Sequence, residues 1–199
     1  MKNPWHIVLL LLSLSFNSLA QVAETATEIS PLLIGETIPD VEVSTLDGKV
    51  VKTSALISEK PTVLIFYRGG WCPYCNRQLS GMQEIQDEIL SLGYQILAVS
   101  PDSPEKLKKT SEDQSLKYQL ISDSKTTLMQ ACGVAFQAPE RKKEQLLEFS
   151  GGNNPGNLPV PTVFILNQKG EILFEYINPN YRVRLESAML MAVLETLRD

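Results

Sequence analysis

The chain has 199 residues, of which 43% are apolar and 21% are charged, and its formal net charge is −5. This length suffices for one domain with a substantial core, and the composition excludes a fibrous or disordered chain. The acidic balance argues against nucleic acid and against an anionic membrane surface as binding partners.

The first twenty residues, 1–20, have the pattern of a secretory signal peptide. Lys2 precedes a short apolar stretch, and Ser18 and Ala20 place small side chains where a signal peptidase cleaves. Cleavage before Gln21 removes Lys2 and leaves 17 basic and 23 acidic residues, a net charge of −6 and no histidine. The apolar stretch is shorter than the roughly 20 residues that span a bilayer, so an uncleaved anchor is the less favoured alternative. We therefore expect an exported protein, periplasmic or secreted, with no stable membrane anchor after cleavage.

Residues 21–33 are polar without a clear period and are expected to form a flexible leader, followed by one domain over residues 34–199. The first half of this domain is predicted to contain a hairpin, a strand, a helix and a second strand, over residues 41–51, 62–67, 79–92 and 95–100. The strand at 62–67 is a continuous run of β-branched and aromatic side chains, which is typical of burial on both faces. Gly93 is expected to end the helix.

The second half of the domain continues this alternation. Ser103 and Pro104 are expected to start a helix, as its cap and its first residue. A strand, two helices, a hairpin and a closing helix are predicted over residues 118–122, 125–132, 137–147, 162–177 and 184–197. The inward side of the closing helix is expected to carry Leu185, Ala188, Met189, Ala192 and Leu197. The Gly/Asn/Pro stretch 150–157 is either a lid over a site or a long connector. This order predicts an α/β fold with a central mixed sheet flanked by helices on both faces.

Cys72 and Cys75 lie three apart, between the strand at 62–67 and the helix that follows it. A closed zinc site takes four Cys or His ligands, and the mature chain offers three cysteines and no histidine. Haem attachment would need a histidine after Cys75, where Asn76 stands. We therefore expect no metal site and no other cofactor.

A structural disulfide and a working redox centre remain for this pair. A bridge between Cys72 and Cys75 would close a very short loop, which gives the least stabilisation through chain entropy. Cys72 also falls at the start of a helix, with Pro73 at the first helical position, and backbone N–H groups there favour a thiolate. The position favours a redox centre.

The segment Trp71-Cys72-Pro73-Tyr74-Cys75 after a buried strand resembles the active-site segment of the thioredoxin-like superfamily. The similarity is greatest to the peroxiredoxin-like branch of the alkyl hydroperoxide reductase and thiol-specific antioxidant family, and it covers residues 34–199. Four stretches carry it, namely 34–40, 99–105, 120–123 and 161–172. The resemblance implies a thiol-dependent peroxide reductase that uses a Cys-x-x-Cys couple and is reset by a thioredoxin-type protein or a small thiol.

This chain differs from the peroxiredoxin pattern at the site. That family places a Thr three residues before its peroxide-attacking Cys, and a Pro four residues before the Thr. Aligned without gaps, the attacking Cys falls on Cys75, the Thr on Cys72 and the Pro on Arg68, while a later arginine of the family falls on Pro161. Lost hydrogen-bond donors of this kind can each cost roughly 3 kcal/mol of transition-state stabilisation. A thiol–disulfide oxidoreductase is therefore the alternative function.

Pro161 followed by Thr162 resembles the cis-proline that lies against the thioredoxin disulfide, whereas thioredoxin's buried acid would fall on Phe66. In the peroxide mechanism Cys75 attacks and Cys72 resolves, and in the disulfide mechanism Cys72 attacks and Cys75 resolves. A non-enzymatic metal carrier on this fold is the least favoured alternative, because the mature chain has no histidine.

Four further side chains have open roles. Arg68 either favours a thiolate by its charge or faces solvent. Trp71 is expected to shape the site. Cys132 ends an apolar helix and is either a buried inert thiol or a second resolving thiol. Lys142 belongs to a basic run, 141–143, that is expected to form a solvated helix face.

Overall fold

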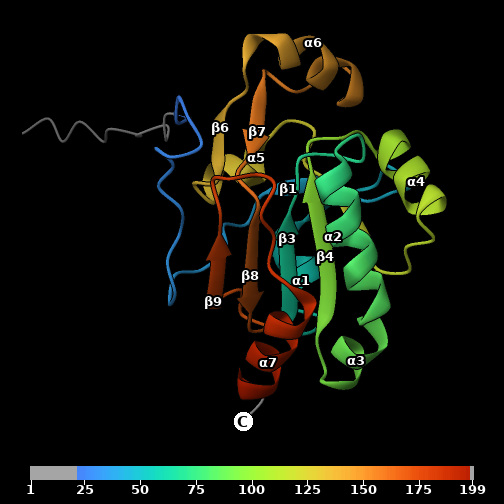
Figure 1. The fold of residues 1–199 in the computed structure, drawn as a ribbon, viewed down its shortest axis with the longest axis vertical. Helices are drawn as coiled ribbons and strands as arrows, with labels where there is room; N and C mark the ends of the chain where they lie inside the picture. The colour runs from blue at the N-terminus through green and yellow to red at the C-terminus, as the bar shows by residue number, and fades with distance from the viewer. Residues whose placement is uncertain (1–21, 198–199) are drawn as a thin grey trace, which may run out of the picture.

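The computed structural model describes residues 22–197, so the predicted signal peptide lies outside the described residues. Its centre is a seven-stranded sheet with the strand order β2-β1-β5-β4-β3-β8-β9 (Figure 1). These strands span Glu42–Ser44 (β1), Val50–Lys52 (β2), Thr62–Phe66 (β3), Gln95–Ser100 (β4), Gln119–Ser122 (β5), Thr162–Leu166 (β8) and Ile172–Ile177 (β9). The sheet is mixed, because β3, β4 and β5 run parallel whereas β8 pairs antiparallel with both β3 and β9.

Helices cover both faces of this sheet. They span Thr53–Ile57 (α1), Pro73–Glu84 (α2), Gln86–Ser91 (α3), Pro104–Asp113 (α4), Thr127–Ala131 (α5), Glu140–Phe149 (α6) and Ser187–Leu197 (α7). Successive residues of β3 point to opposite faces, so Ile65 packs in one core cluster with α2, α3, α4 and α7. Leu64 and Phe66 pack in the other cluster, with α1 and α5. The predicted fold class is therefore confirmed. Among residues 22–197, no helix is long and apolar enough to cross a membrane.

Local sequence signals located most elements correctly. All five residues of β3 are buried, and the Ser103 hydroxyl accepts a hydrogen bond from the Lys106 N–H at the start of α4, as predicted. The predicted helix 79–92 is instead two helices, α2 and α3, because the backbone of Ile85 leaves the helical region (φ −104°, ψ 10°). Two short strands, Ala135–Gln137 (β6) and Asn157–Pro159 (β7), form a small second sheet that was not predicted, and Figure 1 shows α6 beside it.

The predicted inward side of the closing helix is wrong at three of its five residues, since Leu185 is buried in the core and Leu197 packs against it, but the other three are exposed. Leu190 and Leu194 are the buried residues of α7, whereas Met189 is 55% exposed. Ala188 and Ala192 are exposed as well. The helix begins at Ser187, and its sequence is apolar on nearly every side, so its periodicity does not select one face.

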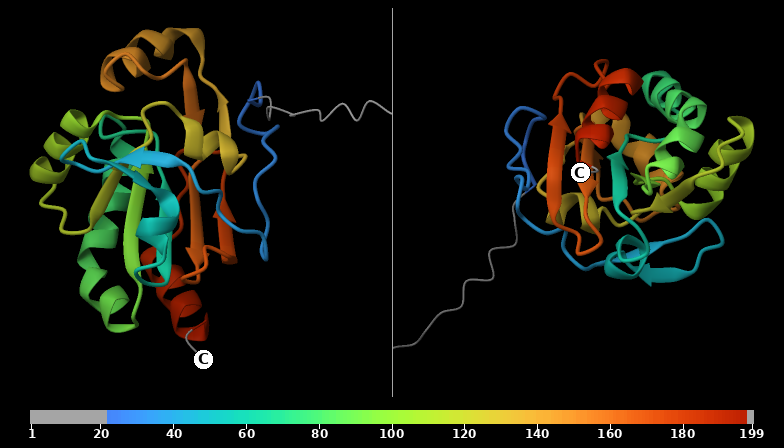
Figure 2. Two further views of the ribbon diagram at one scale, coloured as in Figure 1. Left: turned by 180° about the vertical axis from the view of Figure 1, so that it is seen from behind. Right: turned by 90° about the horizontal axis from the view of Figure 1, so that it is seen from below.

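Residues 22–33, where a leader was expected, lie along the outside of the domain beside β6 and β9 (Figure 2). The Gln137 N–H donates to the Ala23 carbonyl over 2.8 Å. Gly133 has φ +67°, and a Cβ there would lie 1.9 Å from the Ser30 carbonyl oxygen. Glycine at this position thus permits both a left-handed backbone and a close approach of the two segments.

The loop 150–157 is held by its own hydrogen bonds. The Asn154 side-chain oxygen accepts from the N–H groups of Gly156 and Asn157, over 2.8 and 2.7 Å. The Asn157 amide in turn donates to the Thr126 hydroxyl over 3.1 Å. These buried contacts favour the connector interpretation over a lid.

Candidate active site

The two cysteines sit where β3 leads into α2. Cys72 is the N-cap of α2, with an extended backbone (φ −98°, ψ 115°), and Pro73 is the first helical residue, as predicted. The Cys75 N–H donates to the Cys72 carbonyl over 3.0 Å. Both side chains are buried, with Cys72 2% and Cys75 0% exposed, and both are free thiols.

The negative charge of this pair rests on Cys72. The Cys75 thiol donates to Cys72 and lowers its pKa, assisted by the Cys75 N–H, the Arg68 guanidinium and the Tyr74 N–H, against the opposing effect of burial. Burial raises the pKa of Cys75, and the hydrogen bond and charge of Cys72 raise it further. A thiolate at Cys72 with a protonated thiol at Cys75 is the favoured resting state.

Arg68 lies beside Cys72 and is only 9% exposed. Its guanidinium carbon is 4.2 Å from the ring centroid of Tyr181 and 5.3 Å from that of Trp71. The ion pairs within residues 22–197 do not include it. A buried arginine without a carboxylate partner is uncommon, so the Cys72 thiolate is the anion that its charge can compensate. Of the two alternatives for Arg68, the structure supports the one in which its charge favours a thiolate.

A cavity of about 440 Å³ opens over Cys72. Trp71, Pro73 and Pro161 line it, as do several further aromatic and proline side chains. Arg141 and Lys142 line it too, and the Lys142 ammonium lies 4.8 Å from the Trp71 ring centroid. The basic run 141–143 is therefore not only a solvated helix face, because two of its residues border the site.

Pro161 lines this cavity, but its peptide bond with Val160 is trans, since no peptide bond in the described part of the chain is cis. The expected likeness to the thioredoxin cis-proline is wrong at this point. On either side of this bond, the Val160 N–H donates to the Val134 carbonyl and the Pro161 carbonyl accepts from the Asn178 N–H. The Thr162 hydroxyl donates to the Val160 carbonyl over 2.9 Å, so it satisfies the backbone.

Cys132 is not brought to the pair. It is fully buried among the side chains of α1 and α5, whereas Cys72 and Cys75 belong to the core cluster on the opposite face of the sheet. Burial raises the pKa of Cys132 far above the ordinary range of a thiol. This environment favours an inert thiol over a second resolving thiol.

Two residues that the sequence did not single out contact the site. Arg184 donates from Nη2 to the Cys75 Sγ over 3.4 Å, although 109 residues separate the two in the chain. Asp102 is 1% exposed, and its Oδ2 accepts from the Gly70 N–H over 2.8 Å, just ahead of the cysteines. Asp102 lies in the stretch 99–105 that carries the family resemblance, which is a signal for it. Nothing in the local sequence marks Arg184.

Replacing Asp102 with Asn tests the burial of this carboxyl group. Burial raises the pKa of Asp102 to about 7, above the value of about 3.9 in an unfolded chain. The folded protein therefore binds this proton more tightly than the unfolded chain does. The resulting contribution to the free energy of unfolding is fully present below about pH 4 and is lost as the pH rises through about 7. Between about pH 5 and about pH 8 the wild type loses this stability and Asp102→Asn does not, so the variant is expected to gain roughly 2–3 kcal/mol in free energy of unfolding relative to the wild type over that range. Urea unfolding at both pH values measures this, and an equal difference at both would contradict it.

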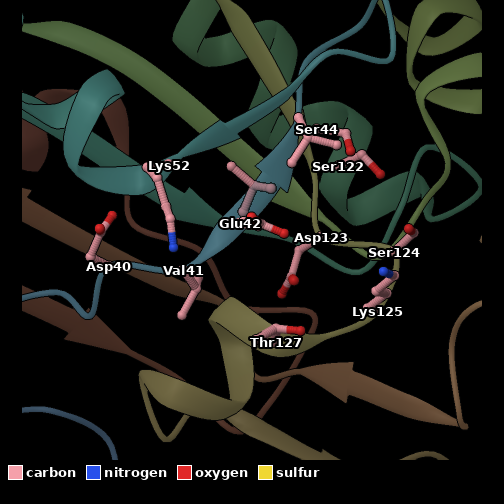
Figure 3. Close-up of a pocket in the computed structure, with 12 residues that line it drawn as sticks. Asp40, Val41, Glu42, Ser44, Lys52, Ser122, Asp123, Ser124, Lys125 and Thr127 are labelled. Atoms are coloured by element: carbon pink, nitrogen blue, oxygen red, sulfur yellow. The ribbon is translucent and has the colours of Figure 1, made fainter.

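A second cavity of about 440 Å³ lies beside β1 and β5, and Figure 3 shows the side chains of Asp40, Glu42 and Asp123 there. It contains neither cysteine of the pair. Asp123 accepts the N–H groups of Leu128 and Met129, so it serves the start of α5. In the range 22–197, no group of three or more His, Cys, Asp or Glu residues is placed to hold a metal ion.

Comparison with known proteins identifies the family. Residues 34–174 match the AhpC/TSA family. The 1-Cys peroxiredoxin of Medicago truncatula is 28% identical over a match that covers 74% of this chain and 65% of that protein. The chain therefore spans just under two thirds of the length of this relative. Peroxiredoxin Bcp of Bacillus subtilis (strain 168) is 28% identical over 83% of this chain and 95% of its own.

Solved structures show the same fold. Peroxidoxin BcpB from Mycobacterium tuberculosis superposes with a TM-score of 0.66 at 21% identity, covering 83% of this chain and 98% of its own. Reduced Prx3 from Vibrio vulnificus, in complex with H2O2, superposes with a TM-score of 0.70 at 18% identity, covering 82% and 99%. Since the family match covers most of the chain and the architecture agrees with these structures, this protein belongs to the AhpC/TSA family, as a peroxiredoxin-like member of the thioredoxin-like superfamily.

Proposed function

We propose that this protein is a thiol-dependent peroxide reductase in which Cys72 is the attacking thiol. The observation that carries the proposal is the placement of Cys72 at the start of α2, beside the buried Arg68 and in the lining of a cavity. A thiolate stabilised by a cation and helix N–H groups is the nucleophile that peroxide reduction requires. Membership of the AhpC/TSA family supports the same reaction.

The reaction has three steps. The Cys72 thiolate attacks one peroxide oxygen, the O–O bond breaks, and the leaving oxygen takes up a proton to give water or an alcohol. Cys72 is then a sulfenic acid, and Cys75 condenses with it to form a disulfide and release water. An outside dithiol supplies two electrons and two protons to restore both thiols. This assignment differs from the motif alignment, which makes Cys75 the attacking thiol, because Cys75 is fully buried and its pKa is raised.

The site needs no cofactor for this chemistry, since sulfur alone carries the electrons. We propose a thioredoxin-type protein or a small thiol as the electron donor. We also propose an exported, periplasmic location, which the signal-peptide pattern of residues 1–20 supports. An exported location would also make a disulfide between Cys72 and Cys75 compatible with its surroundings.

A thiol–disulfide oxidoreductase remains the second candidate. The same observation favours it, because a low-pKa thiol at a helix start with a buried partner three residues later also suits disulfide exchange. In that reaction Cys72 attacks a substrate disulfide and Cys75 resolves the mixed disulfide. The two candidates share the attacking thiol and differ only in the substrate.

Stopped-flow fluorescence of Trp71 separates the two candidates. Trp71 adjoins Cys72, so oxidation of the pair is expected to change its emission. The reduced mature protein, which begins at Gln21 and has Trp71 as its single tryptophan, is mixed with hydrogen peroxide in one experiment and with dithiodipyridine, a neutral disulfide, in another. We expect the reaction with peroxide to exceed that of free cysteine by at least about a hundredfold, as a site-activated thiolate should. A peroxide rate equal to that of free cysteine, beside a fast reaction with the disulfide, would reject the reductase proposal.

A further inference from the structure

Arg184 is fixed against the buried sulfur of the pair. Its Nη2 donates to the Cys75 Sγ over 3.4 Å, and its Nη1 donates to the carbonyls of Tyr181 and Val183. The residue comes from the irregular segment 178–186 that precedes α7, so a distant part of the chain brings the guanidinium to the start of α2. One terminal nitrogen of Arg184 thus binds carbonyls of its own segment, and the other binds the Cys75 sulfur.

Each sulfur of the pair therefore has its own arginine. The charge of Arg68 favours a thiolate at Cys72, and the charge of Arg184 favours a thiolate at Cys75, assisted there by the backbone N–H of Arg68. Tyr67 is also close to Cys75, and burial raises its pKa, so it stays neutral. Cys75 is 0% exposed, so a thiolate on it lacks hydration and depends on such a partner.

Arg184 itself remains partly in contact with solvent. It lines a cavity of about 560 Å³ between α2 and residues 182–187, separate from the cavity over Cys72. A guanidinium with one side in a solvent-accessible cavity keeps its charge at low cost, while its other side meets the buried sulfur. The arrangement delivers a positive charge to an atom that solvent does not reach.

We propose that Arg184 is a catalytic residue that holds the negative charge of Cys75 while the Cys72–Cys75 disulfide forms and breaks. When the disulfide forms, Cys75 loses its proton, its thiolate attacks the Cys72 sulfur, and the group bound to that sulfur leaves with the electron pair. When a donor thiolate attacks the Cys72 sulfur, the Cys72–Cys75 bond breaks and its electron pair goes to Cys75, which later takes up a proton. This inference rests on the proposed redox role of the pair, but it holds for peroxide and disulfide substrates alike.

Dithiodipyridine isolates the step in which Arg184 acts. Attack by Cys72 releases one thiopyridone, and attack by Cys75 on the resulting mixed disulfide releases a second, so the two absorbance phases report the two cysteines. In Arg184→Gln we expect the second phase to slow about tenfold at pH values below the pKa of Cys75, because loss of the arginine charge raises that pKa and leaves less thiolate. The first phase should be unchanged. The second phase should recover as the pH rises, because a higher fraction of Cys75 then ionises without the arginine. In Arg184→Lys, the rate of the second phase should lie between those of the wild type and Arg184→Gln.

Arg182→Gln is the matched control, since it removes the same charge from the same segment at an exposed residue that contacts the Tyr181 ring. It should leave both phases within about twofold of the wild type, and Cys75→Ser should show the first phase alone. A second phase in Arg184→Gln that is as fast as in the wild type would overturn the inference. Equal slowing of both phases, without recovery at higher pH, would also overturn it by assigning Arg184 a structural role. Neither result depends on whether peroxide is the substrate.

Discussion

Replacing Cys72 with Ser is expected to reduce the rate of the first reaction with hydrogen peroxide by at least about a thousandfold. A hydroxyl group does not ionise at neutral pH, so the variant loses the nucleophile, and loss of an attacking side chain commonly costs this much or more. Because the pKa of Cys72 is lowered to about 5, the wild-type rate should be nearly constant from about pH 6 to pH 8. It should fall below about pH 5, where the thiolate is protonated.

The matched variant is Cys75→Ser, which removes the resolving thiol and keeps the attacking one. It should consume one equivalent of peroxide and stop with a sulfenic acid on Cys72 that a dimedone probe traps and mass spectrometry locates. The pKa of Cys72 should rise in Cys75→Ala, which has no side-chain donor, because the hydrogen bond from Cys75 is the largest contribution that lowers it. If the first reaction instead survives in Cys72→Ser and is lost in Cys75→Ser, the motif alignment is right and Cys75 attacks.

Replacing Gly69 with Ala is expected to cost about 2–4 kcal/mol of stability and to slow the reaction of Cys72 by at least about tenfold. Gly69 has φ +138°, a backbone conformation that a side chain makes unfavourable. A Cβ there would lie 2.4 Å from the Trp71 Nε1 and 2.7 Å from the Asp102 Oδ1. Both are side-chain atoms beside the cysteines, because Trp71 lines the cavity over Cys72 and Asp102 binds the Gly70 N–H, so relief of the contact displaces groups that border the cysteine loop.

Urea unfolding and the rate of Cys72 alkylation measure the two effects. Gly152→Ala is the control, because Gly152 also has a positive φ, +85°, but a Cβ there meets nothing within 4 Å. The control should lose stability through backbone strain alone and keep the wild-type alkylation rate. Equal alkylation rates in the wild type and in Gly69→Ala would show that the loop tolerates the displacement and that Trp71 and Asp102 do not position Cys72.

The position of the redox pair was predictable because its causes are local. A continuous apolar run ends at residue 67, Pro73 starts a helix, and Cys72 falls between them, so the start of α2 could be placed from neighbouring residues alone. The same holds for the Ser103 cap of α4. These features depend on backbone dihedrals and on side chains a few residues apart, which the order of residues specifies directly.

The assignment of charge within the pair could not be predicted in this way. The alignment to peroxiredoxins makes Cys75 the attacking thiol. In the structure, burial disfavours a charge on Cys75, whereas the hydrogen bond from Cys75 and the charge of Arg68 favour one on Cys72. Arg184 reaches Cys75 across 109 residues, and Arg68 is held by the ring of Tyr181. These contacts exist only after the sheet and the segment 178–186 have packed.

The sequence by itself therefore determined the α/β class, the boundaries of the central strands and the placement of two cysteines at a helix start. Tertiary structure alone decided which side of α7 is buried, that the Val160–Pro161 bond is trans, and that Arg184 and Asp102 contact the site. The physical reason is the distance along the chain over which each interaction acts. Periodicity and capping act over a few residues, whereas burial and the approach of a distant charge, which set the pKa of a thiol, are properties of the packed molecule.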